Sequence, residues 1–138
     1  MKTDAGMESR GGKNAPVIMA VEDDPMSLHT IKTVLEKRGY VVVSAENAEE
    51  ALRQLRLRAP AVLILDVMMP GMSGYDLCQT IKRDQALQKI PVIFLTAKDT
   101  VEDFKSGREA GGVFYILKPI RPDRLAQAVG MLCRPPQV

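Results

Sequence analysis

Asp66 directly follows the apolar run Ala61–Leu65 and begins a loop that runs to Gly74. Consecutive apolar residues of this kind are typical of a strand that is buried on both faces. A carboxylate at the end of such a strand is costly unless a cation, a ligand or solvent compensates its charge. Asp66 could therefore cap the turn that follows, or it could belong to a site. The residues at the other strand ends distinguish these two interpretations.

Polar side chains of complementary chemistry follow the other apolar runs. The acids Glu22, Asp23 and Asp24 follow the first run, Thr96 follows the fourth and Lys118 follows the fifth. Carboxylates that lie close together repel each other, and a site with few oxygen ligands completed by water suits Mg²⁺. A carboxylate oxygen can also act as a nucleophile toward phosphorus and form an aspartyl phosphate. Such a transfer needs positioning and charge neutralisation, which a lysine, a threonine hydroxyl and Mg²⁺ would provide.

Each of these residues also has an ordinary structural explanation. The acids at 22–24 could be charges that a helix dipole favours at its N-terminus. Thr96 is a common type of strand residue, and Lys118 could be a surface lysine. Their joint placement favours a site, because open parallel sheets bind ligands at the carboxyl ends of their strands.

An alternation of strands and helices would place these side chains at one edge of a sheet. Short apolar runs without strict alternation predict strands that are covered on both faces, and amphipathic periodicity predicts helices between them. The expected strands are Val17–Val21, Tyr40–Ala45, Ala61–Leu65, Pro91–Leu95 and Val113–Leu117. The expected helices span about residues 25–38, 74–83, 100–110 and 122–133, and another begins at Asn47.

Local signals support two of these helices. Pro25 suits the first turn of a helix, and Gly39 suits the stop after one. Asn47 can accept a hydrogen bond from the backbone of Glu50 while the Glu50 side chain returns one, as in a capping box.

The composition indicates one globular domain. The chain has 138 residues, of which 46% are hydrophobic and 26% are charged, and its net charge of +2 is too small to indicate nucleic acid. No apolar run approaches the roughly 20 residues that a membrane helix requires. The two cysteines lack metal-binding spacing and suit a reducing compartment. We therefore expect a cytoplasmic protein with a flexible leader over residues 1–15, a domain over 16–133 and a tail over 134–138.

The domain resembles the receiver domain of the two-component response-regulator family over about residues 16–133. The resemblance rests on four segments in this order and at these spacings, which are Val21–Pro25, Asp66–Gly74, Phe94–Ala97 and Tyr115–Pro119. It implies the flavodoxin-like fold of the chemotaxis type. In that α/β fold a doubly wound, five-stranded parallel sheet of order 2-1-3-4-5 lies between two layers of helices.

The resemblance also implies a role for each acid. Asp66 would be the phosphoacceptor. Asp23 and Asp66 would bind Mg²⁺ directly, Glu22 would bind it through water, and the Met68 carbonyl would be a further ligand. The acidic pair is Glu-Asp where the family often has Asp-Asp, and this difference leaves the site intact.

Three other residues acquire roles in the same way. Lys118 would hold the phosphoryl group, and Thr96 would form a hydrogen bond with it after transfer. Tyr115 matches an aromatic switch that turns inward when the threonine follows the phosphate. The Lys118–Pro119 peptide bond is often cis in this family.

The function that the resemblance implies is a phosphorylation-activated switch. A histidine kinase or a phosphotransfer protein would donate the phosphoryl group, and the domain would catalyse its own phosphorylation and dephosphorylation without being a metabolic enzyme. The surface of helix 100–110, strand 113–117 and helix 122–133 would then change. This surface would contact a downstream protein or form a homodimer, and the domain itself would bind no nucleic acid or membrane.

Val113 and Phe114 stand where the family usually has two acidic residues. Phe114 could pack under the helix at 100–110. Alternatively, the two side chains could form an apolar patch that binds a partner or a second copy of the chain.

Two other functions compete with this interpretation. An aspartyl-phosphate phosphatase of the haloacid-dehalogenase type usually carries a second Asp two residues after its nucleophile, where this chain has Met68. A pseudo-receiver that works without phosphorylation would have degraded acids, and here they are intact. The pseudo-receiver remains the alternative.

Overall fold

The computed structural model describes residues 15–97, 105 and 108–134. Within these ranges the elements in chain order are β1 (Val17–Val21), α2 (Pro25–Glu36), β2 (Val41–Ala45), α3 (Ala48–Leu57), β3 (Val62–Asp66), α4 (Gly74–Lys82), β4 (Val92–Thr96), β5 (Phe114–Leu117) and α6 (Pro122–Leu132). Residues 108–110 are also helical, and most of the helix predicted over 100–110 lies outside the described residues.

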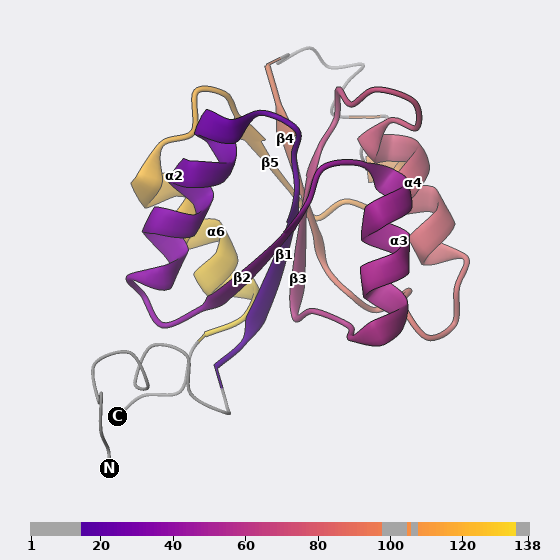
Figure 1. The fold of residues 1–138 in the computed structure, drawn as a ribbon, viewed down its shortest axis with the longest axis horizontal. Helices are drawn as coiled ribbons and strands as arrows, with labels where there is room; N and C mark the ends of the chain where they lie inside the picture. Colours follow the sequence, from indigo (N-terminus) through magenta and orange to yellow (C-terminus); the bar gives the residue numbers. More distant parts are fainter. Residues whose placement is uncertain (1–14, 98–104, 106–107, 135–138) are drawn as a thin grey trace.

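The strands form one parallel sheet in the order β2-β1-β3-β4-β5, as predicted. Figure 1 shows this sheet between two layers of helices, with α2 and α6 on one face and α3 and α4 on the other. The fold is therefore the three-layer, doubly wound α/β arrangement that the sequence pattern indicates. None of the helices in the described ranges is long and apolar enough to span a bilayer.

The core divides into two clusters because successive strand residues point to opposite faces of the sheet. Met19, Leu63 and Phe94 face the layer of α3 and α4. Ile18 and Ile64 face the layer of α2 and α6. Strands β1, β3 and β4 are buried along their whole length, which explains their nearly continuous apolar sequence.

Two strands extend one residue beyond the apolar runs that predicted them. Asp66 pairs with Leu95 of β4, and Thr96 pairs with Leu117 of β5. Asp66 and Thr96 are therefore the last residues of their strands, because the backbone pairing continues past the apolar side chains.

The predicted helix signals are mostly confirmed. Pro25 is the first residue of α2, and Gly39 beyond its end has a φ of +94°. Asn47 caps α3 by accepting a hydrogen bond from the Glu50 amide at 2.8 Å. The reciprocal bond differs from the prediction, since the Glu50 carboxylate accepts from the Glu46 amide, at 2.9 Å.

Candidate functional site

The carboxyl edge of the sheet, where the strands end, brings together the predicted acids. Glu22 follows β1 and is 1% exposed, while Asp66 at the end of β3 is 3% exposed. Asp23 beside them is exposed. One carboxylate oxygen from each of these three residues lies within 4.8 Å of the others. Such a donor set fits a hard divalent cation, which prefers oxygen ligands.

Asp24 has a different role from its two acidic neighbours. Its carboxylate accepts hydrogen bonds from the amides of Met26 and Ser27 and from the Ser27 hydroxyl, the last at 2.8 Å. Asp24 is therefore the N-cap of α2. Its own amide donates to Glu22 Oε2 at 3.1 Å, which fixes the orientation of the Glu22 side chain.

Lys118 follows β5 and directs its ammonium group at both buried acids. Its Nζ lies 2.9 Å from Glu22 Oε1 and 3.1 Å from Asp66 Oδ2. The Lys118 amide donates to the Thr96 carbonyl at 2.8 Å, which holds this segment beside β4. The Lys118–Pro119 peptide bond is cis, as the resemblance implies.

The charges at this edge are incompletely balanced. The pKa of Glu22 rises to about 7, because burial and then the neighbouring Asp66 raise it more than the hydrogen bonds with Lys118 and the Asp24 amide lower it. Burial lowers the pKa of Lys118, but its contacts with Glu22 and Asp66 outweigh this and leave the pKa above its ordinary value. Lys118 thus has two carboxylates to itself, whereas Glu22 shares one ammonium group with Asp66. The two carboxylates at this edge could therefore stabilise a further positive charge in addition to that of Lys118.

The loop after Asp66 is closely tied to the strand. The Met68 amide donates to Asp66 Oδ1 at 3.1 Å, and the Gly74 amide donates to the Val67 carbonyl at 3.1 Å. A Cβ atom at Gly74 would collide with the Asp66 carbonyl oxygen. Glycine is therefore required at the start of α4, and the Met68 backbone lies within reach of the Asp66 carboxylate.

The remaining predicted residues lie on β4 and β5. Thr96 is buried at the end of β4, the strand that pairs with β3. Tyr115 on β5 packs against the α3–α4 side of the core, with its ring centroid 5.5 Å from that of Phe94. The distance from the Tyr115 ring to the Phe94 ring is comparable to the 4.9 Å that separates Phe94 from Tyr75.

Sequence reasoning missed Tyr75, in the first turn of α4. Its hydroxyl oxygen lies 2.8 Å from the hydroxyl oxygen of Tyr115. The available signal was a tyrosine immediately after Gly74 in a chain with only three tyrosines. This signal does not by itself indicate a partner 40 residues away.

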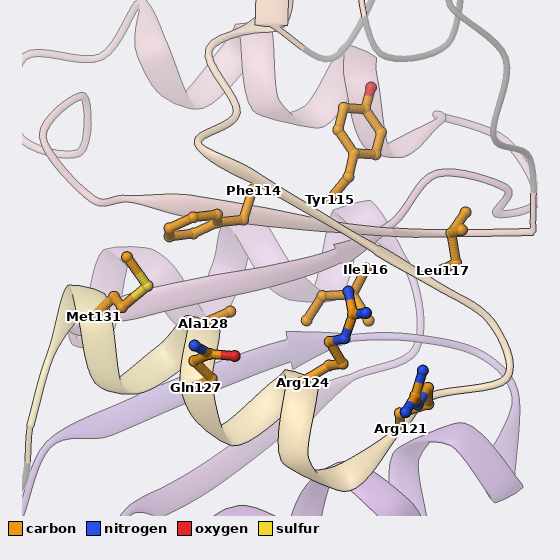
Figure 2. A pocket seen from close by; sticks show the side chains of 9 residues that line it. All are labelled: Phe114, Tyr115, Ile116, Leu117, Arg121, Arg124, Gln127, Ala128 and Met131. Carbon is orange, nitrogen blue, oxygen red and sulfur yellow. The ribbon is translucent and has the colours of Figure 1, made fainter.

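The described residues do not support the first of the two alternatives for Phe114, packing under the helix at 100–110, most of which lies outside them. Phe114 is half-buried and packs against the core cluster of α2 and α6, whereas Ala110 belongs to the opposite cluster. The reason is strand alternation, which directs Tyr115 to one face and its neighbour Phe114 to the other. Figure 2 shows the two rings on opposite sides of β5.

A groove between β5 and α6 lies beside Phe114. Met131 and Leu117, which line it, are 65% and 44% exposed. Residues that line the groove include Phe114, Ile116, Arg124, Gln127, Ala128 and Met131 (Figure 2). Apolar side chains therefore share the β5–α6 groove with Arg121, Arg124 and Gln127, and its use by a partner stays a prediction.

Comparison with known proteins identifies the family to which this site belongs. The family model of the response regulator receiver domain matches residues 18–130. This chain belongs to the response regulator receiver domain family. As a receiver domain, it is 31% identical over 112 residues to protein PilH of Pseudomonas aeruginosa, covering 81% of this chain and 93% of PilH.

Longer relatives match the receiver domain over part of their length. The chain is 37% identical over 121 residues to a protein of Cyanophora paradoxa named "Probable transcriptional regulator ycf27", covering 88% of this chain and 49% of that protein. The chain thus spans about half the length of several relatives that it matches.

Solved structures agree with this assignment. The signal receiver domain of a signal transduction histidine kinase from Syntrophus aciditrophicus is 39% identical, with a TM-score of 0.79 and coverage of 86% of this chain and 89% of that one. A response regulator from Thermotoga maritima is 30% identical, with a TM-score of 0.78 and coverage of 86% and 97%.

Proposed function

We propose that this receiver domain is a signalling switch that accepts a phosphoryl group on Asp66. The observation that carries the proposal is the position of the Asp66 carboxylate. It is buried at the end of a central strand, 3.1 Å from the Lys118 ammonium and within 4.8 Å of two other acids. A turn cap needs none of these neighbours, whereas phosphoryl transfer needs a nucleophile surrounded by groups that neutralise charge.

In the transfer, an Asp66 carboxylate oxygen attacks the phosphorus of a phosphohistidine. The phosphorus–nitrogen bond breaks as the phosphorus–oxygen bond forms, and the departing imidazole takes a proton from solvent. The donor would be a histidine kinase or a phosphotransfer protein in the cytoplasm. Later attack by water on the acyl phosphate would return Asp66 and release inorganic phosphate, so the domain would catalyse both half-reactions on itself.

Glu22, Asp23 and Asp66 would hold Mg²⁺, with the Met68 carbonyl as a further ligand. The bound ion would neutralise the phosphoryl oxygens. Two features support this assignment. The donor atoms are all oxygens, and Glu22 Oε1 makes no hydrogen bond of good geometry within the described ranges although Lys118 Nζ is nearby.

Lys118 would hold a phosphoryl oxygen, and Thr96 at the end of the adjacent strand would form a hydrogen bond with another. Movement of Thr96 would favour a different packing of Tyr115 on β5. The result would be a population shift at the surface formed by residues 100–110, β5 and α6, which would bind a downstream protein or a second copy.

The test is acyl-phosphate labelling of the purified chain with acetyl phosphate, followed by intact mass spectrometry. We expect the wild type to gain one phosphoryl group that hydroxylamine removes, and to gain it only with Mg²⁺. Asp66→Asn should gain none. Asp123→Asn, an exposed acid in the first turn of α6, is the matched control and should label like the wild type. Labelling that persists in Asp66→Asn would contradict the assignment. Failure of the wild type to label with either acetyl phosphate or a phosphorylated donor protein would favour the pseudo-receiver.

A further inference from the structure

Three aromatic rings connect α4, β4 and β5 on the α3–α4 side of the sheet. The Tyr75 ring meets the Phe94 ring edge-on, at 4.9 Å and 71°, and Phe94 lies 5.5 Å from Tyr115. Phe94 is fully buried, and both tyrosines are half-buried. The Tyr75 and Tyr115 hydroxyl oxygens are 2.8 Å apart, so one donates a hydrogen bond to the other beyond the Phe94 ring.

The α4 end of this chain of contacts is fixed to the Asp66 backbone. The residue before Tyr75 is Gly74, whose amide donates to the Val67 carbonyl and whose Cα leaves no space for a Cβ against the Asp66 carbonyl. Ser73 caps α4 by accepting from the Asp76 amide at 3.2 Å. A change at the Asp66–Val67 peptide therefore has to displace the first turn of α4, which carries Tyr75.

Tyr115 forms the β5 end of this chain of contacts. Tyr115 leaves β5 on the side opposite to Phe114 (Figure 2). Its ring occupies the space beside Phe94 while its hydroxyl bonds to Tyr75. Loss of that bond would remove a directional restraint on the ring, because a ring contact such as that with Phe94 fixes an orientation less well than a hydrogen bond does.

We propose that Tyr75 is a positioning residue that holds the Tyr115 ring in its place beside Phe94 and couples the Asp66 loop to β5. The coupling runs from the Asp66–Val67 peptide through Gly74 and the Tyr75 hydroxyl to Tyr115. It is separate from the route through Thr96, since it uses α4 rather than the end of β4. The regulatory part of the proposal rests on the proposed function, because phosphorylation of Asp66 would be the event that uses the coupling. The positioning of Tyr115 by Tyr75 does not depend on phosphorylation.

The test uses fluorotyrosine incorporated into the whole chain. The sequence has three tyrosines and no tryptophan, so fluorine NMR gives one signal each for Tyr40, Tyr75 and Tyr115. Tyr75→Phe removes one hydroxyl and keeps the ring that contacts Phe94. We expect the Tyr115 signal to move, and the fraction of Tyr115 accessible to a soluble paramagnetic probe to rise roughly 2- to 12-fold, the change expected from one hydrogen bond.

Tyr40→Phe is the matched control. The Tyr40 hydroxyl also makes one hydrogen bond, to the Cys133 carbonyl at 2.6 Å, but it lies in the other core cluster. This variant should leave the Tyr115 signal in place. Tyr115→Phe gives the reciprocal measurement, in which the Tyr75 signal should move. A Tyr115 signal that shifts no more in Tyr75→Phe than in Tyr40→Phe would overturn the proposal.

A second measurement adds acetyl phosphate and Mg²⁺ and separates the two proposals. In the wild type the Tyr115 signal should respond to phosphorylation, and the response should shrink in Tyr75→Phe although labelling of Asp66 continues. An undiminished response would refute the coupling. If the wild type does not label, the proposed function fails, but the unphosphorylated spectra still decide whether Tyr75 positions Tyr115.

Discussion

The two edges of the sheet differ in how well their polar groups are satisfied. At the carboxyl edge, Glu22 and Asp66 are buried acids that share one lysine, and the backbone is packed so closely that Gly74 cannot carry a side chain. At the amino edge, where the strands begin, the Tyr40 hydroxyl donates to the Cys133 carbonyl, and Lys82 Nζ donates to the carbonyls of Gln88 and Ile90 at 3.0 and 2.6 Å.

The polar contacts at the amino edge stabilise the fold, whereas the buried acids at the carboxyl edge lower its stability. Unbalanced buried charge at the carboxyl edge is unfavourable for folding, and it is the condition under which a cation or a phosphoryl group can change the energy of the site. The amino edge can be altered without touching that site. Substitutions at the two edges should therefore separate stability from function.

The largest effect is expected from Gly74→Ala. The added Cβ would collide with the Asp66 carbonyl, which is backbone and cannot rotate away. We expect the free energy of unfolding to fall by about 1–3 kcal/mol. Urea denaturation measures this, and labelling of Asp66 at a temperature where the variant is folded should also be slower than in the wild type.

Gly130→Ala is the control for that substitution at the other edge. Gly130 lies near the end of α6, and a Cβ there would meet nothing within 4 Å. Because alanine favours a helix more than glycine does, the free energy of unfolding should rise by about 0.5–1 kcal/mol. Equal losses in both variants would show that Gly74 is no more closely packed than an ordinary helical glycine.

The next largest effect is expected from Glu22→Gln, and it is stabilising. The pKa of Glu22 rises from 4.5 to about 7 on folding, so the folded protein holds the extra proton between these values. The contribution of this group to stability is present below about pH 4.5 and is lost as the pH rises through about 7. At pH 8 without Mg²⁺, Glu22→Gln should melt about 2–6 °C higher, since roughly 1 kcal/mol corresponds to a few degrees for a domain of this size.

Mg²⁺ should reduce the difference in melting temperature between Glu22→Gln and the wild type. If Glu22 contributes to the cation site, Mg²⁺ should raise the melting temperature of the wild type more than that of Glu22→Gln. Glu49→Gln, an exposed acid in the first turn of α3, controls for the loss of one charge. A variant that is less stable than the wild type at pH 8 without Mg²⁺ would show that Lys118 balances Glu22 completely.

Tyr40→Phe should have a smaller effect, and one confined to stability. It removes the hydrogen bond to the Cys133 carbonyl, so the free energy of unfolding should fall by about 0.5–1.5 kcal/mol. Asp66 labelling should proceed at the wild-type rate, measured by the same mass spectrometry. Slower labelling would mean that the two edges are coupled through the sheet.

The smallest effect is expected from Met131→Ser in the β5–α6 groove. Because Met131 is 65% exposed, the free energy of unfolding should stay within about 0.5 kcal/mol of the wild type. If the groove mediates self-association, sedimentation velocity should show less dimer in this variant, with or without phosphorylation. Unchanged association would leave the β5–α6 groove without a role in dimerisation.

The sequence predicts the parallel sheet and the acidic edge well because both depend on patterns along the chain, whereas the strand order was implied only by the family resemblance. Apolar runs separated by amphipathic segments indicate a parallel sheet, and every such strand ends at the same edge. Asp66 could therefore be placed at the same edge as Glu22 and Asp23 from its position alone. The cis bond before Pro119 was implied only by the family resemblance.

The contacts that the sequence did not predict depend on how the elements pack together or on local side-chain geometry. The face on which Phe114 packs depends on the pairing of β5 with β4, and a shift of one residue exchanges the faces. The Tyr75–Tyr115 hydrogen bond depends on the relative positions of α4, β4 and β5. The Glu50 carboxylate accepts a hydrogen bond from the Glu46 amide rather than from the Asn47 amide, and the capping pattern does not specify this local geometry.

The hydrogen bond from the Met68 amide to Asp66 Oδ1 has a consequence for amide hydrogen exchange. The adjacent amide, on Val67, donates instead to the Leu95 carbonyl at 2.9 Å and so reports on the sheet. An acyl phosphate on Asp66 would weaken the carboxylate as an acceptor and speed exchange at Met68 while exchange at Val67 stays slow. Two neighbouring protons of the backbone would then record, separately, the chemical state of the carboxylate and the integrity of the fold.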